Sequence, residues 1–332
     1  MTTRENATAP LTPISPSMSP AGRESRGSEG KEAGPSLLPA PHAPSDQDEP
    51  RRRLSADLAE HFRDLWAYRE LLLQFTRRDI RVRYKQAAIG VAWAVLTPLV
   101  VILSGWVLRL AFGRISGEMP NDQMMAGVAV KSLGWAFFVG AMGFGTASIT
   151  GHLSLITKTY FPRAILPIAS VLTQLVDAAI ALAALAIALP FFGVGFSLGL
   201  LWVLPVAILL VLFTTAVTLA ASCANVFFRD AKHLVQIVLS FGIFFTPVFF
   251  DASAFGHAGS RVVMLNPLSP MLEGLRLAIV QGHNLARPLV DGAGLLIWTP
   301  AYLAYSAVVA IVGLLLTMAY FHRAEFDFAE YV

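Results

Sequence analysis

A dense run of basic residues precedes the first long apolar segment of the chain and could bind anionic groups. Arg77, Arg78, Arg81, Arg83 and Lys85 fall within nine residues. Anionic lipid head groups attract such cations at about 1 kcal/mol each. Basic residues beside an apolar segment also fix its orientation in a membrane. The run therefore predicts either a topology signal alone or a cationic surface that docks on something.

The position of these cations on a helix favours a docking surface. When residues 62–85 are placed on a wheel at about 100° per residue, most of the cations share one arc and apolar side chains fill the remainder. Arg69 and Arg83 are the two exceptions. A topology signal does not require this order, whereas a helix lying in the membrane interface does. We therefore predict an amphipathic interfacial helix over 56–86, whose interface carries Arg77, Arg78, Arg81, Arg83, Tyr84 and Lys85.

A single acidic residue, Asp177, lies near the middle of an apolar stretch, with Gln174 one turn before it. A carboxylate at that depth in a membrane costs several kcal/mol unless it is paired or hydrated. It should therefore face the interior of a helix bundle or another subunit. Hydrogen bonding between helices is one role for it, and a proton relay is another. Because no second acidic residue lies at comparable depth, hydrogen bonding is favoured.

Composition places the chain among membrane proteins. Its 332 residues are 55% hydrophobic and 14% charged, whereas a soluble domain carries about 25% charged residues. The net charge of +3 does not indicate nucleic acid, because the basic residues flank apolar segments. The one cysteine, Cys223, has no partner for an intrachain disulfide, and no metal site is predicted. Residues 1–55, rich in Pro, Ser, Ala and Gly, are predicted to form a disordered tail.

Six apolar stretches are long enough to cross a hydrocarbon core, which needs about 20 residues. They cover residues 88–112, 133–150, 165–189, 198–224, 234–250 and 295–321. The expected fold is an all-α membrane protein in which 87–332 forms a six-span transmembrane domain after the interfacial helix. Residues 251–294 are too polar for a span and predict short extracytoplasmic helices before the last one. Lys131 interrupts the approach to the second span, so that it either snorkels outward or meets an anionic substrate group.

Lysine and arginine are distributed unequally between the two sides of this predicted bundle. Counted from Arg51 onward, fifteen lie on the side that holds residues 51–85, and six lie on the other. Basic residues accumulate on the cytoplasmic side of membrane proteins. Both termini are therefore expected to be cytoplasmic, which agrees with an even number of spans.

Five stretches of the chain are similar to one family. LLLQFTRRDIRVRYKQAAIGVAWAVLTPL resembles the N-terminal signature of ABC-2 type membrane subunits that export polysaccharides, namely the O-antigen, capsule and teichoic-acid permeases. The other four stretches are LITKTYFPRAILPIASV (155–171), FFRDAKHLVQIVLSFGIFFTPVFF (227–250), NPLSPMLEGLR (266–276) and FHRAEFDFAEYV (321–332). The resemblance covers about residues 60–332, which is nearly everything outside the tail.

This resemblance implies a permease subunit that moves lipid-linked polysaccharide across the bacterial cytoplasmic (inner) membrane. It implies a homodimer of six-span subunits with two cytoplasmic ATPase partners. The chain lacks the GxxxxGK[ST] pattern of a phosphate-binding loop. The protein is therefore expected to be no enzyme, to hold no cofactor itself, and to depend on ATP and Mg in the partner ATPase. No nucleic-acid partner is expected.

The resemblance also gives particular residues expected roles. The loop after the second span resembles the segment that couples to the ATPase, with Leu155, Lys158, Tyr160, Phe161, Pro162 and Arg163. The segment before the last span resembles an outer gate, with Asn266, Pro267, Pro270, Glu273 and Arg276. Glu273 and Arg276 are three residues apart and could pair on one helical face. Aromatic residues that could line a substrate channel, or form a membrane-interface belt, are Trp106, Trp135, Phe137 and Phe138.

Two other functions remain open from the residues alone. An ion-coupled secondary transporter would use Asp177 as its coupling group, but would be expected to contain further intramembrane acids. A membrane-bound glycosyltransferase would need a cluster of carboxylates near the membrane face. Asp79 and Asp230 are the only acids close to the short cytoplasmic loops, and both are flanked by cations.

Overall fold

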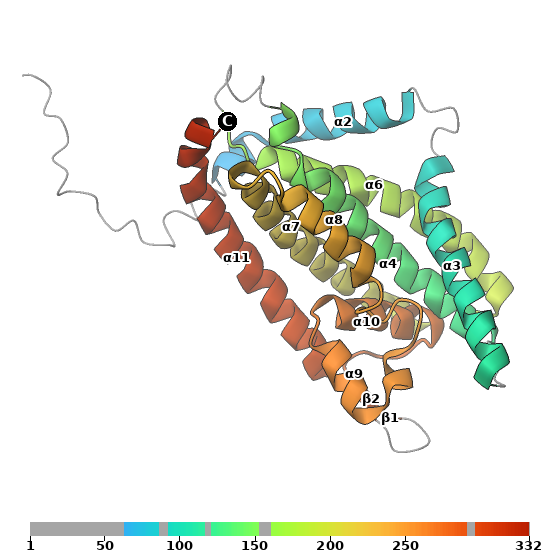
Figure 1. The fold of residues 1–332 in the computed structure, drawn as a ribbon. Helices are drawn as coiled ribbons and strands as arrows, with labels where there is room; N and C mark the ends of the chain where they lie inside the picture. The colour runs from blue at the N-terminus through green and yellow to red at the C-terminus, as the bar shows by residue number, and fades with distance from the viewer. Residues whose placement is uncertain (1–62, 86–91, 117–120, 153–160, 291–295, 332) are drawn as a thin grey trace, which may run out of the picture. The chain divides into compact units, whose positions relative to one another are not determined.

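The computed structural model describes residues 63–85, 92–116, 121–152, 161–290 and 296–331, all of which belong to the unit 51–332. Most of these residues are helical (Figure 1). The α-helices are α2 (Arg69–Lys85), α3 (Ala92–Ser116), α4 (Asp122–Thr146), α6 (Ile165–Ala188), α7 (Val203–Phe227), α8 (Ala231–Gly242), α9 (Gly256–Met264), α10 (Leu268–Val280) and α11 (Pro300–Tyr331). The 3-10 helices are η1 (Thr150–His152), η2 (Leu189–Phe192), η3 (Leu198–Trp202) and η4 (Ala252–Phe255). Strands β1 (Leu289–Val290) and β2 (Leu296–Trp298) pair antiparallel.

Four helical segments are long and apolar enough to cross a membrane. They are Asp122–Thr146, Ile165–Phe192, Leu198–Phe227 and Pro300–Glu325. A fifth candidate is the pair Ala258–Met264 and Leu268–Val280, which is bent by 106°. The described part of the chain is thus a helical protein with four or five candidate spans, consistent with a multi-pass membrane protein.

The predicted spans differ from the helices in three places. The second span begins at Asp122 and not at 133. Lys131 does not interrupt the helix, because its charge is paired with Asp251 inside the protein. The first predicted span falls on α3, whose apolar part is the shorter stretch Leu99–Ala111. The fifth falls on α8, a helix of 12 residues that is followed by turns up to Phe250. The count of six spans therefore stays a prediction.

Helix α4 lies at the centre of the described bundle. It packs against α3, α6, α7 and α10, while α7 also packs along α11. The apolar window of α4 is 67% buried, whereas those of the other three candidate spans are only 17–22% buried. The side chains of Ile187, Leu204 and Leu316 point outward from these other helices. Because large exposed apolar surfaces suit contact with lipid, the outer helices have the character of membrane-facing elements.

Local signals explain where the central elements begin and end. Asn121 caps α4, because its side-chain oxygen accepts a hydrogen bond of 2.8 Å from the backbone N–H of Met124. The turn after η2 ends at Gly193, which adopts a left-handed conformation with φ of 70°. Asn266 likewise accepts a 3.1 Å hydrogen bond from the backbone N–H of Leu268 at the start of α10.

The two ends of the bundle carry different elements. Figure 1 shows α2 and the C-terminal part of α11 at one end, whereas α9 and the two strands lie toward the other. Helix α2 packs on α6, and Phe75 of α2 belongs to a small buried cluster with Phe161 and Ile165. A second cluster at the end of α11 contains Phe321 and Phe328. These two clusters hold together the end of the bundle that carries α2, and both are separate from the main core around α4.

Candidate functional site

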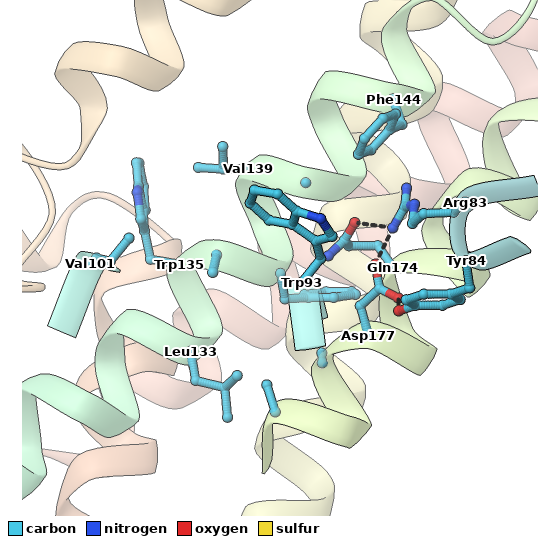
Figure 2. Close-up of a pocket in the computed structure, with 15 residues that line it drawn as sticks. Arg83, Tyr84, Trp93, Val101, Leu133, Trp135, Val139, Phe144, Gln174 and Asp177 are labelled. Carbon is cyan, nitrogen blue, oxygen red and sulfur yellow. Dashed lines mark hydrogen bonds and ion pairs between the residues drawn. The ribbon is translucent and has the colours of Figure 1, made fainter. Parts of the chain in front are cut away.

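The C-terminal end of α2 meets the middle of α6 at an ion pair, shown in Figure 2. Arg83 pairs with one carboxylate oxygen of Asp177, and the hydroxyl of Tyr84 donates a hydrogen bond to the other oxygen. The Nη1 of Arg83 also donates to Oε1 of Gln174 at 3.2 Å. Asp177 is buried. Its carboxylate is thus paired inside the bundle, as its cost in a membrane environment requires.

Arg83 is one of the two cations that lie off the cationic arc of the predicted helix, and its pairing with Asp177 gives the reason. Arg77, Arg78, Arg81 and Lys85 are exposed. The guanidinium of Arg83 instead lies 4.2 Å from the ring centroid of Phe144 on α4. The end of α2 is therefore attached to both α4 and α6. Of the exposed cations, Arg78 pairs with Asp79 at 2.9 Å and contacts His152.

Tyr84 remains a neutral hydrogen-bond donor in this site. Burial, and to a lesser extent the hydrogen bond to the Asp177 carboxylate, raises the pKa of Tyr84 to about 12. Loss of the phenolic proton would place a second negative charge beside Asp177. The site thus contains one positive, one negative and several neutral polar groups.

A cavity of about 350 Å³ borders these polar groups. Trp93 and Val101 of α3, Trp135, Phe137 and Phe144 of α4, and residues of α6 line it (Figure 2). Gly140 of α4 leaves the room that Gln174 occupies, because a Cβ atom built there would lie 2.4 Å from the Gln174 Cδ. The cavity therefore combines aromatic walls with a polar wall that depends on one glycine.

The structure brings together only part of the predicted aromatic set. Trp135 and Phe137 are buried and both line this cavity. Phe138 lines a neighbouring cavity of about 820 Å³, which it shares with Trp135; the two rings have centroids 5.8 Å apart. Trp106 is exposed and lines neither of these two cavities. Trp93 joins the set, although sequence reasoning did not single it out.

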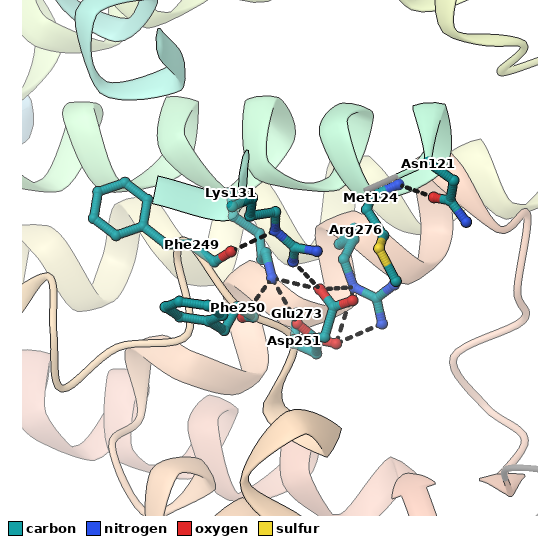
Figure 3. A network of polar contacts seen from close by, with 9 residues as sticks. Asn121, Met124, Lys131, Phe249, Phe250, Asp251, Glu273 and Arg276 are labelled. Atoms are coloured by element: carbon teal, nitrogen blue, oxygen red, sulfur yellow. Dashed lines mark hydrogen bonds and ion pairs between the residues drawn. The ribbon is translucent and has the colours of Figure 1, made fainter. Parts of the chain in front are cut away.

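A second polar network joins α4, α10 and the segment after α8, as Figure 3 shows. Lys131 Nζ lies 2.8 Å from Asp251 Oδ1 and 3.5 Å from Glu273 Oε2. Arg276 Nη2 lies 2.6 Å from Glu273 Oε1, which confirms the predicted pair. Arg109 of α3 reaches Asp251 at 3.5 Å. We call these five residues the outer network, because Asp251, Glu273 and Arg276 lie in the segment 251–294, which is predicted to be extracytoplasmic.

The outer network also binds the backbone between α8 and η4. Lys131 Nζ donates to the carbonyl of Phe250 at 2.8 Å, and Arg109 Nε donates to that of Phe249 at 2.7 Å. Burial alone would raise the pKa of Asp251, but the charges of Lys131, Arg276 and Arg109 lower it to about 2. The acid therefore stays ionised at any ordinary pH, and the segment is held by charge as well as by packing.

The structure corrects the prediction made for Lys131. Its side chain neither snorkels outward nor lies open to a substrate, because it is fully buried and paired with two acids. The remaining residues of the expected outer gate are also fixed by the protein. Asn266 Nδ2 donates to Thr246 Oγ1 at 3.1 Å, and the carbonyl of Pro267 accepts from Ser306 Oγ at 2.9 Å. Pro270 is buried.

The expected coupling segment is described only in part, because Leu155, Lys158 and Tyr160 lie outside the described residues. Phe161 is buried, and its ring centroid lies 5.9 Å from that of Phe75 on α2. Pro162 is also buried. Phe161 therefore anchors this segment to α2 and does not present its ring on the surface of the chain.

Arg163 ties the same segment to the end of α11. Its backbone N–H donates to Glu325 Oε1 at 2.6 Å, and its Nη1 donates to the Glu325 carbonyl at 3.0 Å. The guanidinium also lies 5.7 Å from the ring centroid of Phe328. The segment 161–163, α2 and the C-terminal part of α11 are thus one connected surface, which sequence reasoning treated as three separate motifs.

Comparison with known proteins identifies a matching family and several similar proteins. The ABC-2 type transporter family matches residues 70–280. An O-antigen export system permease protein RfbA from Myxococcus xanthus is 30% identical over 237 residues, covering 69% of this chain and 87% of the relative. A protein of the same name from Klebsiella pneumoniae is 24% identical over 265 residues, covering 79% of this chain and 94% of the relative. The family match begins one residue inside α2 and extends over the residues that line the cavity and those of the outer network.

Proposed function

The chain belongs to the ABC-2 type transporter family, and on this premise we propose that it is the permease subunit of an exporter of lipid-linked polysaccharide. The relatives named for O-antigen export support a glycan substrate. The protein itself breaks and forms no covalent bonds. A separate cytoplasmic ATPase binds ATP and Mg and supplies the energy.

The proposed assembly is a homodimer of six-span subunits in the bacterial cytoplasmic membrane. Helices α3 and α8 supply the first and fifth spans, although each is shorter or less apolar than the other four in the described residues. Both termini are cytoplasmic, as the distribution of lysine and arginine favours. The outer network then lies at the far end of the bundle and closes the exit, which is the role expected of an outer gate.

The observation that carries the proposal is the connected surface formed by α2, residues 161–163 and the end of α11. Phe161 joins the segment to Phe75, and Arg163 joins it to Glu325. A force applied by an ATPase to any one of the three elements reaches the other two. Because α2 also ends at the Arg83–Asp177 pair, the same movement reaches the cavity between α3, α4 and α6.

Co-purification with the ATPase encoded beside this protein tests the proposal. We expect a stable complex that hydrolyses ATP and exports glycan only when ATP is present. If the protein purifies alone and glycan export survives ATP depletion, the proposal fails.

The coupling segment has its own test in the same preparation. Replacing Phe161 by Ala removes the ring that holds the segment on α2, and replacing Tyr160 by Ala removes the adjacent ring. We expect Phe161→Ala to weaken ATPase association because it releases the segment from α2, and Tyr160→Ala to weaken it about tenfold or more, as the loss of an interface anchor does. Neither change should prevent membrane insertion. Unchanged association in both variants would remove the assignment of this segment.

Ion-coupled transport through Asp177 is the alternative. In such a transporter the carboxylate exchanges an ion during each cycle, yet here it already accepts hydrogen bonds from Arg83 and Tyr84. Membership of the ABC-2 family also argues against it. Transport that follows an imposed proton gradient in the absence of ATP, and that is lost in Asp177→Asn, would favour the alternative.

A further inference from the structure

The short helix η1 (Thr150–His152) lies where the chain passes from α4 into the expected coupling segment. Residues 153–160 connect it to Phe161 and lie outside the described residues. In the proposed function an ATPase moves this segment, and η1 is the described element that adjoins it on the N-terminal side. The contacts of η1 therefore decide which other helices follow such a movement.

Asn225 joins η1 to the start of α8. It lies in the last turn of α7 and is 2% exposed. Its Oδ1 accepts a hydrogen bond of 3.2 Å from the backbone N–H of Lys232, and its Nδ2 donates one of 3.1 Å to Oγ1 of Thr150. Because a backbone N–H can only donate, the amide oxygen must face Lys232 and the amide nitrogen must face Thr150. One buried side chain thus connects three elements.

The bond to Lys232 takes the place of an ordinary helix cap. A cap residue usually accepts a hydrogen bond from the second or third backbone N–H of its helix, but the side chain of Asp230, the residue before α8, makes no such bond. Lys232 is the second residue of α8, and its N–H is bound by Asn225 from α7 instead. The start of α8 is therefore held by a side chain that also holds η1.

Helix α8 is otherwise weakly embedded in the protein. Of its 12 residues, Ala231 and Leu239 are the buried ones. It packs beside α4 and α7 (Figure 1), and α4 is the helix whose apolar window is 67% buried. Elements with few buried contacts move at a lower cost than elements of the core. A displacement between these two helices is therefore expected to move α8 and to leave α4 in place.

Movement of α8 would change two cavities. One, of about 490 Å³, lies between α4 and α8, with Trp135 and Val139 on one side and Gln236 and Leu239 on the other. The cavity of about 820 Å³ also borders α8. Gly242 at the end of α8 already lies close to the Trp135 ring, because a Cβ atom built there would be 3.0 Å from Cη2. The position of α8 against α4 therefore sets the width of both cavities.

A second contact joins η1 to α2. Nδ1 of His152 lies 2.8 Å from the carbonyl oxygen of Ser148, which can only accept, so that Nδ1 of the neutral ring carries the proton. Nε2 then accepts a hydrogen bond of 2.7 Å from Nη2 of Arg78. The Arg78 guanidinium lies 4.8 Å from the ring centroid of Phe75, the α2 residue that packs on Phe161. Helix η1 is thus bonded to α2 on one side and, through Asn225, to α8 on the other.

From these contacts we propose that Asn225 is a positioning residue for transport, which passes movement of the coupling segment from η1 to the start of α8. The proposal rests on the proposed function, because the ATPase supplies the movement. It identifies α8 as the wall that moves against α4, and the hydrogen bonds of Asn225 to Thr150 and Lys232 as the connection. Networks of hydrogen bonds between rigid elements are one carrier of such coupling.

Thr150→Val separates this role from a purely structural one. Valine matches threonine in shape and leaves the bond that caps α8, but it removes the hydroxyl that Asn225 binds. In nanodiscs with the ATPase, we expect ATPase binding and ATP hydrolysis to stay unchanged. The glycan exported per ATP should fall about three- to tenfold, as the loss of one hydrogen bond predicts. Unchanged export per ATP, or loss of ATPase binding in this variant, would overturn the proposal.

Two further variants are matched controls. Thr150→Ser keeps the hydroxyl and should export as the wild type does. Thr215→Val removes a hydroxyl that donates to the carbonyl of Val211 in its own helix, so that export per ATP should again be unchanged. An equal loss in Thr215→Val and Thr150→Val would show that the effect is not particular to the bond with Asn225, and would overturn the proposal.

Hydrogen–deuterium exchange of the complex measures the movement itself. In the wild type, ATP turnover should change the exchange of backbone amides at the start of α8 as well as around η1. In Thr150→Val the change around η1 should persist, and the change at α8 should be lost. An identical ATP-dependent change at α8 in the two proteins would overturn the proposal. Absence of any change at α8 in the wild type would overturn it without recourse to a variant.

The wild-type complex separates the two proposals. Failure of the wild type to assemble with the ATPase, or export that does not need ATP, would overturn the proposed function. A wild type that exports with ATP, beside a Thr150→Val variant with the same export per ATP, would overturn the role of Asn225 alone.

Discussion

The Arg83–Asp177 site and the outer network use the same chemistry in different surroundings. In both, a cation on one helix pairs with an acid far along the chain. At the first site the Arg83 side chain is 24% exposed and a cavity lies beside it. In the outer network the side chains of Lys131 and Glu273 are both 0% exposed. The two sites therefore differ in how exposed their charged side chains are, and not in the types of residue that form them.

This difference determines what each group can do. The cations of the outer network bond to acids and to the carbonyls of Phe249 and Phe250, so that their donors are used by the protein. Such a network holds segments together, and it must break or move as a unit if that end of the protein opens. The Arg83–Asp177 site lies beside a cavity, so that its polar groups are not enclosed by protein on every side.

The largest effect is expected for Lys131→Met, which breaks the outer network at its centre. The change removes one of the two cations that Asp251 and Glu273 share and leaves them with Arg276 alone between them. Removal of one partner from a buried ion pair costs about 3–5 kcal/mol. Thermal unfolding in detergent should show a clear loss of stability, whereas Lys232→Met, at an exposed position, should change little. Similar unfolding of the two variants would show that the outer network is not structural.

A smaller loss of stability is expected for Asp177→Asn. Asparagine keeps the size of the side chain and can still accept hydrogen bonds from Tyr84 and Arg83, and the cavity lets water reach the guanidinium. We expect a cost of about 1–3 kcal/mol, below that of Lys131→Met, but a larger loss of export than this cost explains. Measuring unfolding and ATP-dependent export on both variants tests the ordering. A larger destabilisation by Asp177→Asn would reverse the comparison.

Arg276→Lys makes a finer test of the outer network. Both Nε and Nη2 of Arg276 contact Glu273 Oε1, at 2.9 and 2.6 Å, and lysine cannot reproduce this geometry. Because the positive charge is kept, the expected cost is only about 1 kcal/mol. Thermal unfolding beside Lys131→Met would check it. An equal effect of the two changes would mean that geometry, and not charge, dominates the network.

No effect is expected from mild acid on the outer network. The pKa of Asp251 is lowered to about 2 in the folded protein, below the unfolded value of about 3.9. Its contribution is therefore fully present above the unfolded value and is lost only as pH falls through about 2. Thermal unfolding of the wild type compared with Asp251→Asn should show a difference that is constant between pH 8 and pH 5. A difference that shrinks across this window would contradict the pKa.

Sequence patterns indicated the helical class and several helices because these depend on local information. The length of an apolar run predicts a span, and the wheel identified Arg83 as a residue that does not belong to the exposed cationic arc. The partner of Arg83 could not be found this way, because Asp177 lies 94 residues further along the chain. The start of α4 was predicted too late for the same reason. A lysine looks like the end of an apolar segment until its acids, Asp251 and Glu273, are known.

The order of residues alone was enough to indicate a membrane protein of the ABC-2 type, the cationic face of the segment before the first span, and the pairing of Glu273 with Arg276 one helical turn apart. The tertiary structure decided which charged residues are used internally and which remain exposed. It also decided that Trp93, Trp135 and Gln174 line one cavity. Burial and contact between distant segments set these outcomes, and both depend on how helices pack, which no local pattern of residues specifies.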